Sequence, residues 1–177
     1  MKLEVIHNCC SPMMLEFIKY HAQQSENWNF KYPMGASTPF EDKHAKLEVI
    51  CGSKKMPDEK LSGMAAGLLI NIYEKSEDAF IPDILFCGIS LKDIHRKDNI
   101  HKDHHEDGLK DIKIVKLLGV LNSDWQDDWG GGFIHGDKLY PVKPTDFLLF
   151  DPKIDHKADD ILVDKKRLAI DFTVRAK

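Results

Sequence analysis

Residues 112–150 read IKIVKLLGVLNSDWQDDWGGGFIHGDKLYPVKPTDFLLF, and this stretch decides the fold. It contains short apolar runs at 112–121, 131–135, 138–142 and 146–150. Turn-forming residues separate these runs: Asn122-Ser123-Asp124, Gly136-Asp137 and Pro144-Thr145-Asp146. Several short strands at this spacing, with marked turns between them, are typical of an all-β sandwich or barrel.

The same pattern continues on both sides of this stretch. Further strands are predicted at 84–91 and 99–103, and in pieces between 162 and 174. Before residue 80 the chain mixes strands, at 2–7, 28–32 and 46–51, with two helical segments. No internal repeat or linker is visible. We therefore predict one mainly β domain over residues 1–177, in which 1–80 supports a barrel core formed by 81–177.

The two helices have clear start signals. Ser11-Pro12 offers a good N-cap and a proline at the first helical position, and the helix should run to about Ala22. The second should run from about Asp58 to Glu74. Residues at helical spacing are expected to face the core: Met13, Met14, Phe17, Ile18 and His21 in the first helix, and Leu61, Met64, Ala65, Leu68 and Ile72 in the second.

Composition narrows the functional class. The 25 basic and 29 acidic residues give a net charge of -4, so the chain lacks the overall positive charge typical of nucleic-acid-binding proteins. The start of the chain has no signal-peptide pattern, and the apolar runs are far shorter than the roughly 20 residues that a membrane helix needs. With four cysteines and no secretory signal, we expect a cytoplasmic protein with reduced thiols. No feature of the sequence indicates an oligomeric state.

A histidine-rich segment at 99–108, NIHKDHHEDG, is the first candidate site. If 100–103 is extended, His101 and Asp103 point to the same side, because strand side chains alternate. His156, 53 residues after Asp103, could return as a third ligand. Two histidines and one carboxylate on one face form the metal site of non-haem Fe(II) oxygenases.

Other interpretations of this segment remain open. His105 and Asp107 form a second His-x-Asp pair, offset by four residues. His101 and His105 could bind zinc from a helix, although Gly108 and the flanking Asp and Asn residues disfavour one. A solvated loop without metal is the simplest alternative.

Arg167 is the second candidate. It follows His156 by 11 residues and begins an apolar alternation. An arginine at the head of a strand beside a metal can hold a carboxylate through two parallel hydrogen bonds.

Taken together, these residues resemble the prolyl-4-hydroxylase-like branch of the Fe(II)/2-oxoglutarate dioxygenases, particularly small phage and bacterial members. The resemblance covers about 100–172, roughly 40% of the chain, and follows landmarks in family order. They are Ile100-His101-Lys102-Asp103, Leu121-Asn122-Ser123-Asp124-Trp125, Trp129-Gly130-Gly131, Leu148-Leu149-Phe150-Asp151, His156 and Arg167-Leu168-Ala169-Ile170.

The resemblance implies a double-stranded β-helix, or jelly-roll barrel. It implies that His101, Asp103 and His156 bind Fe(II), which favours this register over His105 and Asp107. It also implies that Arg167 binds the C5 carboxylate of the co-substrate 2-oxoglutarate, that O₂ is the oxidant and that ascorbate supports activity. The expected reaction is hydroxylation of an unactivated C–H bond, with release of succinate and CO₂.

The chain also departs from the family pattern. Gly119 stands where many relatives have a tyrosine that helps to hold 2-oxoglutarate, and Gly132 where a glutamate often follows the Gly-Gly pair. Asp171 stands where some relatives have a threonine. If Asp171 shares a face with Arg167, it would repel a bound carboxylate unless it is paired or protonated.

The substrate expected from the resemblance is a prolyl or other residue in a peptide or protein. A free amino acid or another small molecule is the first alternative. A non-catalytic metal- or ligand-binding jelly roll is the second, and a structural zinc protein, which lacks support from any Cys-x-x-Cys, is the third. The segments 33–43 and 92–99 are expected to be surface loops, with lids as the alternative.

Overall fold

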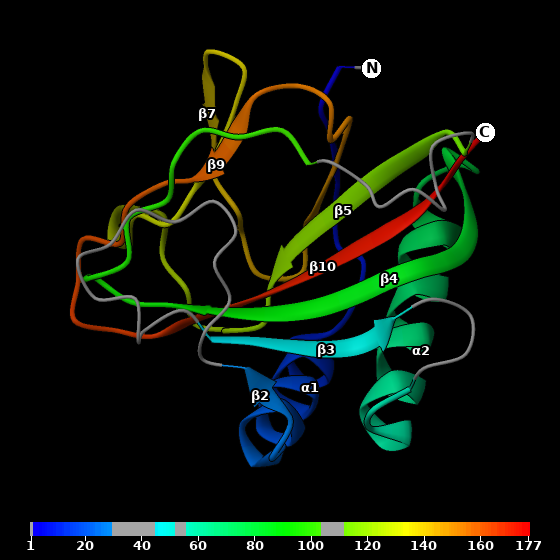
Figure 1. The fold of residues 1–177 in the computed structure, drawn as a ribbon, viewed down its shortest axis with the longest axis horizontal. Coiled ribbons are helices and arrows are strands. Elements are labelled where there is room, and N and C mark those ends of the chain that lie inside the picture. The colour runs from blue at the N-terminus through cyan, green and yellow to red at the C-terminus, as the bar shows by residue number, and fades with distance from the viewer. Residues whose placement is uncertain (1, 30–44, 52–55, 104–111) are drawn as a thin grey trace.

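The computed structural model describes residues 2–29, 45–51, 56–103 and 112–177, and in it the chain is mainly β with two helices (Figure 1). The main sheet has seven strands in the order β1-β8-β5-β10-β4-β3-β2, and every neighbouring pair is antiparallel. These strands are β1 (Glu4–Ile6), β2 (Trp28–Asn29), β3 (Ala45–Cys51), β4 (Phe80–Lys92), β5 (Ile114–Val120), β8 (Phe147–Phe150) and β10 (Arg167–Ala176).

A second, three-stranded sheet completes the architecture. Its order is β7-β6-β9, and its strands are β6 (Phe133–His135), β7 (Lys138–Tyr140) and β9 (His156–Ala158). A short 3-10 helix, η4 (Asp127–Trp129), precedes it. A compact apolar cluster joins the two sheets, with Phe133 of β6 packed against Phe150 of β8. The small sheet therefore covers part of the main sheet on the side away from the helices (Figure 1).

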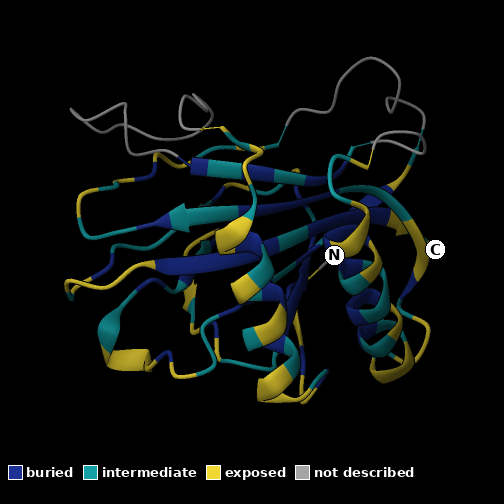
Figure 2. Cartoon of the chain, turned by 90° about the horizontal axis from the view of Figure 1, so that it is seen from below, coloured by how far each residue is buried: buried dark blue, intermediate teal, exposed yellow. Residues whose placement is uncertain are grey.

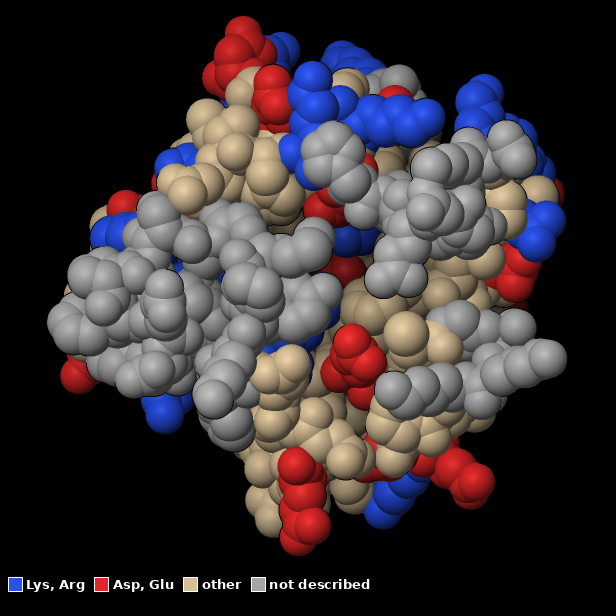
Figure 3. All heavy atoms as spheres, viewed as in Figure 1, with Lys and Arg blue, Asp and Glu red and all other residues tan. Residues whose placement is uncertain are grey.

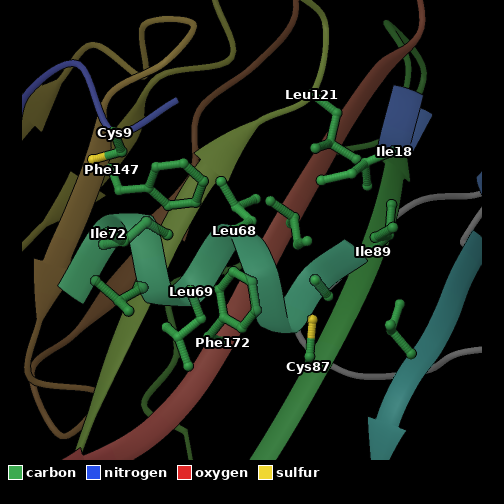
Figure 4. Packing of buried hydrophobic residues seen from close by; sticks show 14 of the residues in the cluster. Cys9, Ile18, Leu68, Leu69, Ile72, Cys87, Ile89, Leu121, Phe147 and Phe172 are labelled. Carbon is green, nitrogen blue, oxygen red and sulfur yellow. The ribbon is translucent and has the colours of Figure 1, made fainter. Parts of the chain in front are cut away.

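Helices α1 (Pro12–Gln24) and α2 (Glu59–Lys75) cover the other face of the main sheet, with their buried sides turned towards it (Figure 2). Alternation along β10 places Phe172 in the core under α2, beside Leu68 and Leu69 (Figure 4). Arg167, Ala169 and Asp171 consequently lie on the opposite face of the same strand. This face, between the sheets, is where the candidate site forms.

Both helix starts agree with the sequence prediction. The Ser11 side chain accepts a hydrogen bond from the Met14 amide, and Asp58 caps α2 in the same way. The predicted core face of α1, however, is partly wrong. Met13 and Phe17 are 69% and 56% exposed, whereas Leu15, Ile18 and Ala22 are fully buried. Both stripes have helical spacing, and packing on the sheet selects the second.

Three further predictions need correction. The segment 99–103 is not a strand, because His101 makes only an isolated bridge with His156. The strand β9, which begins at His156, was not predicted. The pieces expected between 162 and 174 are one continuous strand, β10. None of the helices in the described part of the chain has both the length and the apolar character needed to cross a bilayer.

Candidate metal centre

His101, Asp103 and His156 come together although 53 residues separate the last two. The backbones of His101 and His156 exchange two hydrogen bonds, of 3.0 and 2.9 Å, and the Asp103 amide donates to the Pro152 carbonyl at 3.0 Å. One donor atom from each of the three side chains lies within 4.8 Å of the other two. The short extended segment therefore does place His101 and Asp103 on one side, facing the first residue of β9.

The hydrogen bonds of the two histidines fix which nitrogen faces the centre. His101 Nδ1 lies 2.9 Å from the Asn99 carbonyl, and His156 Nδ1 lies 2.7 Å from the Ile154 carbonyl. A carbonyl can only accept, so each Nδ1 must donate, and in a neutral imidazole Nε2 then carries the lone pair. Each Nε2 lies 3.6 Å from an oxygen of Asp103. Metal-binding histidines are commonly oriented in this way.

Asp103 supplies the negative charge of the group. Burial alone would raise its pKa, but contacts with His156 and with the Lys116 ammonium outweigh that effect and hold the pKa far below the ordinary carboxyl value. Asp103 is therefore ionised at neutral pH. Two imidazole lone pairs and one carboxylate on one side are the donor set of the non-haem Fe(II) facial triad, which leaves the remaining coordination positions open.

The aromatic surroundings hold one side of the centre rigid. Phe133 and Phe150 lie 5.5 and 5.3 Å from the His156 ring, between centroids, and the His156 side chain is only 5% exposed. The His101 side chain is 32% exposed. Solvent and ligands therefore reach the centre from the His101 side.

Arg167 lines the same cavity as the three candidate ligands, and part of its hydrogen-bonding capacity is unused. It is 2% exposed, and among the described residues its Nε and Nη2 have no hydrogen-bond partner. Burial, opposed by Asp98 and reinforced by Arg96, lowers the pKa of Arg167 to about 10, so the guanidinium keeps its charge at neutral pH. Buried hydrogen-bond donors on a charged group are costly when they have no acceptor, and a bound anion would supply both the acceptor and the counter-charge.

Two motifs noted in the sequence position this arginine. Asn122 holds the start of β10, accepting from the Leu168 amide at 2.8 Å and donating to the Lys166 carbonyl at 3.0 Å. Gly131 has a φ of +71° and lies against the arginine stem, where a Cβ would be 3.0 Å from Arg167 Cδ. Both motifs therefore serve the geometry of Arg167.

A buried ion network behind Arg167 was missed in the sequence. Lys92 Nζ donates to Asp98 Oδ2 at 2.9 Å and Arg96 Nε donates to Asp98 Oδ1 at 2.8 Å. The expectation of a surface loop at 92–99 is therefore wrong for Lys92 and Asp98, which are 2% and 7% exposed. Charged side chains can be buried when they are paired, and here the partners lie within the same short segment.

One cavity of about 150 Å³ joins the triad and the arginine. Its wall includes His101, Asp103, His156, Arg96, Arg167, Lys116 and Asp171. In the space-filling view, basic and acidic side chains are visible together in the hollow at the centre of this face (Figure 3). A metal at the triad and an anion at Arg167 would therefore share one space.

The departures from the family pattern have different structural consequences. Gly119 does not line the cavity: a Cβ there would point into the ring of Phe147, under the helices, whereas Leu118 faces the cavity. A Cβ on Gly132 would be 2.9 Å from both Leu139 Cδ1 and the Tyr140 carbonyl, which leaves no space for a glutamate. Asp171 does line the cavity and shares it with Arg167.

Some predicted residues lie outside the described part of the chain. They are the alternative ligands His105 and Asp107, and the segment 33–43.

Comparisons with known proteins give structural matches only. No family model and no curated protein matches the sequence. A prolyl-4-hydroxylase from Pseudomonas putida matches with a TM-score of 0.64 at 15% identity, over 99% of this chain and 92% of that one. The viral collagen prolyl hydroxylase vCPH from Paramecium Bursaria Chlorella virus-1, in complex with 2-oxoglutarate, matches with a TM-score of 0.64 at 9% identity, over 100% and 97%.

A third match is HygX from Streptomyces hygroscopicus with nickel, 2-oxoglutarate and hygromycin B bound. Its TM-score is 0.63 at 13% identity, over 99% of this chain and 83% of that one. At these identities the matches establish the fold alone, and they confirm the predicted double-stranded β-helix.

Proposed function

We propose that this chain is an Fe(II)- and 2-oxoglutarate-dependent dioxygenase, with His101, Asp103 and His156 as the iron ligands and Arg167 as the anchor of the distal carboxylate. The observation that carries the proposal is the presence, in one cavity, of the converging triad and of a buried arginine with unused donors. A co-substrate that chelates a metal at one end and carries a carboxylate at the other satisfies both halves of the site.

The donor set fits the metal, and the cavity wall fits the co-substrate. When bound, iron and 2-oxoglutarate activate O₂ and supply the oxidant for C–H hydroxylation, with succinate and CO₂ as products. The protein fixes the two imidazoles through the Asn99 and Ile154 carbonyls and keeps Asp103 ionised. Arg167, held by Asn122 and Gly131, orients the distal end of the co-substrate.

For the substrate we propose a prolyl or other residue in a peptide or protein. Two of the matched structures are prolyl hydroxylases by name, which supports this choice. The HygX structure holds hygromycin B, which supports a small molecule as the alternative. Succinate formation from 2-oxoglutarate, measured with proline-containing peptides and with free amino acids, separates the two substrate classes.

The first test is spectroscopic. Fe(II) and 2-oxoglutarate added without oxygen should produce a visible metal-to-ligand charge-transfer band. The substitutions His101→Ala, Asp103→Ala and His156→Ala should each abolish it, while His105→Ala should leave it intact. A band that survives His101→Ala and is lost with His105→Ala would identify the alternative pair, His105 and Asp107, as the metal ligands.

Arginine variants on one strand test the co-substrate half of the site. Arg167→Met should bind iron and give no band at 2-oxoglutarate concentrations that saturate the wild type. Arg175→Met is the matched control, because Arg175 lies on the same strand and pairs with Asp83 at the surface. If iron binds and the wild type gives no band, the chain is a non-catalytic metal-binding jelly roll.

A further inference from the structure

Asp171 poses an electrostatic problem for the proposed site. It lies four residues after Arg167 on β10, so both side chains leave the same face of the strand and line the same cavity. Its Oδ2 is buried and, within the described chain, makes no hydrogen bond. A carboxylate at this position repels the carboxylate that Arg167 is proposed to bind.

Lys116 on β5 lies where it can remove this repulsion. Its Nζ is 2.8 Å from Asp103 Oδ2 and 3.4 Å from Asp171 Oδ2. The register explains the contact: Asp171 is opposite Leu118, so Lys116 is its diagonal neighbour on the same face of the sheet. The three side chains are only 12–14% exposed, so solvent screens the charges weakly.

The same ammonium also pairs with the proposed metal ligand. Lys116 Nζ donates a hydrogen bond to Asp103 Oδ2 at 2.8 Å. The two oxygens of Asp103 face the two imidazoles, with Oδ1 3.6 Å from His101 Nε2 and Oδ2 3.6 Å from His156 Nε2. Lys116 therefore offsets the charge of Asp103 as well as that of Asp171.

We propose that Lys116 is a positioning residue of this centre, whose ammonium bridges the metal ligand Asp103 and the wall residue Asp171 so that the cavity accepts a dianionic 2-oxo acid. This inference rests on the proposed function, because it assigns a role towards the same co-substrate. The side chain is not a ligand and takes no part in the chemistry. It balances the negative charge of the carboxylates that line the cavity.

A double-mutant cycle on the Fe(II)-loaded protein tests the inference without turnover. The dissociation constant of 2-oxoglutarate is measured anaerobically from the charge-transfer band for wild type, Lys116→Met, Asp171→Asn and the double variant. Lys116→Met exposes the co-substrate to the uncompensated Asp171 and should weaken binding at least about tenfold, or about 1.4 kcal/mol. Asp171→Asn should bind at least as tightly as wild type, and the double variant should bind within about threefold of it.

Each outcome decides between a charge-balancing role and a merely structural one. A double variant as weak as Lys116→Met, or a Lys116→Met variant that binds like wild type, overturns the inference. If Lys116→Met does not fold, the double variant decides alone, since it lacks both charges and must still bind within about threefold of wild type. A wild-type protein without the band refutes the proposed function itself, whereas a band with no coupling in the cycle refutes only the role of Lys116.

Discussion

Replacing Gly119 by alanine adds one methyl group where Phe147 leaves no space for it. The new Cβ would lie 2.5 Å from Phe147 Cε1 and 2.6 Å from Cζ. Phe147 is fully buried in the core beneath the helices, where close packing restricts movement of the ring (Figure 4). Gly119 does not have a left-handed backbone conformation, so the cost of the substitution is steric.

The expected magnitude follows from two opposing effects. Overpacking a core with a methyl group costs about 1–3 kcal/mol. Replacing a strand glycine by alanine recovers about 0.5–1 kcal/mol through the unfolded chain. We therefore expect Gly119→Ala to lower the free energy of unfolding by about 1–2 kcal/mol. Gly63→Ala is the matched control: Gly63 is exposed within α2, a Cβ there would meet no atom within 4 Å, and the variant should gain about 0.5–1 kcal/mol.

Urea unfolding followed by far-ultraviolet circular dichroism measures both changes. The midpoint should fall for Gly119→Ala and rise for Gly63→Ala, with the slope unchanged. Because Gly119 faces the helices, folded Gly119→Ala should bind 2-oxoglutarate like wild type. Equal stability of Gly119→Ala and wild type would show that Phe147 does not pack over this glycine. Loss of co-substrate binding without loss of stability would place position 119 in the site after all.

Three other predictions concern stability. Asp98→Asn leaves the buried Lys92 ammonium without its counter-charge and should cost about 3–5 kcal/mol in urea unfolding, whereas Asp160→Asn, in an exposed ion pair, should cost less than about 1 kcal/mol. Burial alone would raise the pKa of Asp98, but Arg96 and Lys92 outweigh it and lower the pKa. The stability that ionised Asp98 provides is therefore complete above about pH 4 and is lost as the pH falls through the depressed folded pKa. The difference in free energy of unfolding between wild type and Asp98→Asn should therefore shrink in acid, and a larger difference there would contradict this. Ser11→Ala removes the cap of α1 and should cost about 1 kcal/mol, and an unchanged urea midpoint would rule the cap out.

Features that depend on neighbouring residues were predictable from the sequence. The capping side chains Ser11 and Asp58 begin the helices as expected, because a cap bonds to an amide three residues away. The apolar runs between marked turns correctly indicated a mainly β fold. The two-residue spacing of His101 and Asp103 correctly placed them on one side, although an isolated bridge and one further backbone hydrogen bond, not a strand, hold them there.

Only the tertiary structure decided which distant residues meet. Two stripes of α1 have helical spacing and share Ile18, and burial of Leu15 and Ala22 against the sheet, in place of Met13 and Phe17, follows from a packing surface built by other segments. Lys116 and Asp171 belong to strands whose pairing no local pattern specifies, and their contact depends on the register between those strands. Strand partners form through long-range hydrogen bonds. The sequence by itself therefore determined the helices, most of the strands and the ligand spacing, while the pairing of strands decided the cavity, its buried charges and the balance among them.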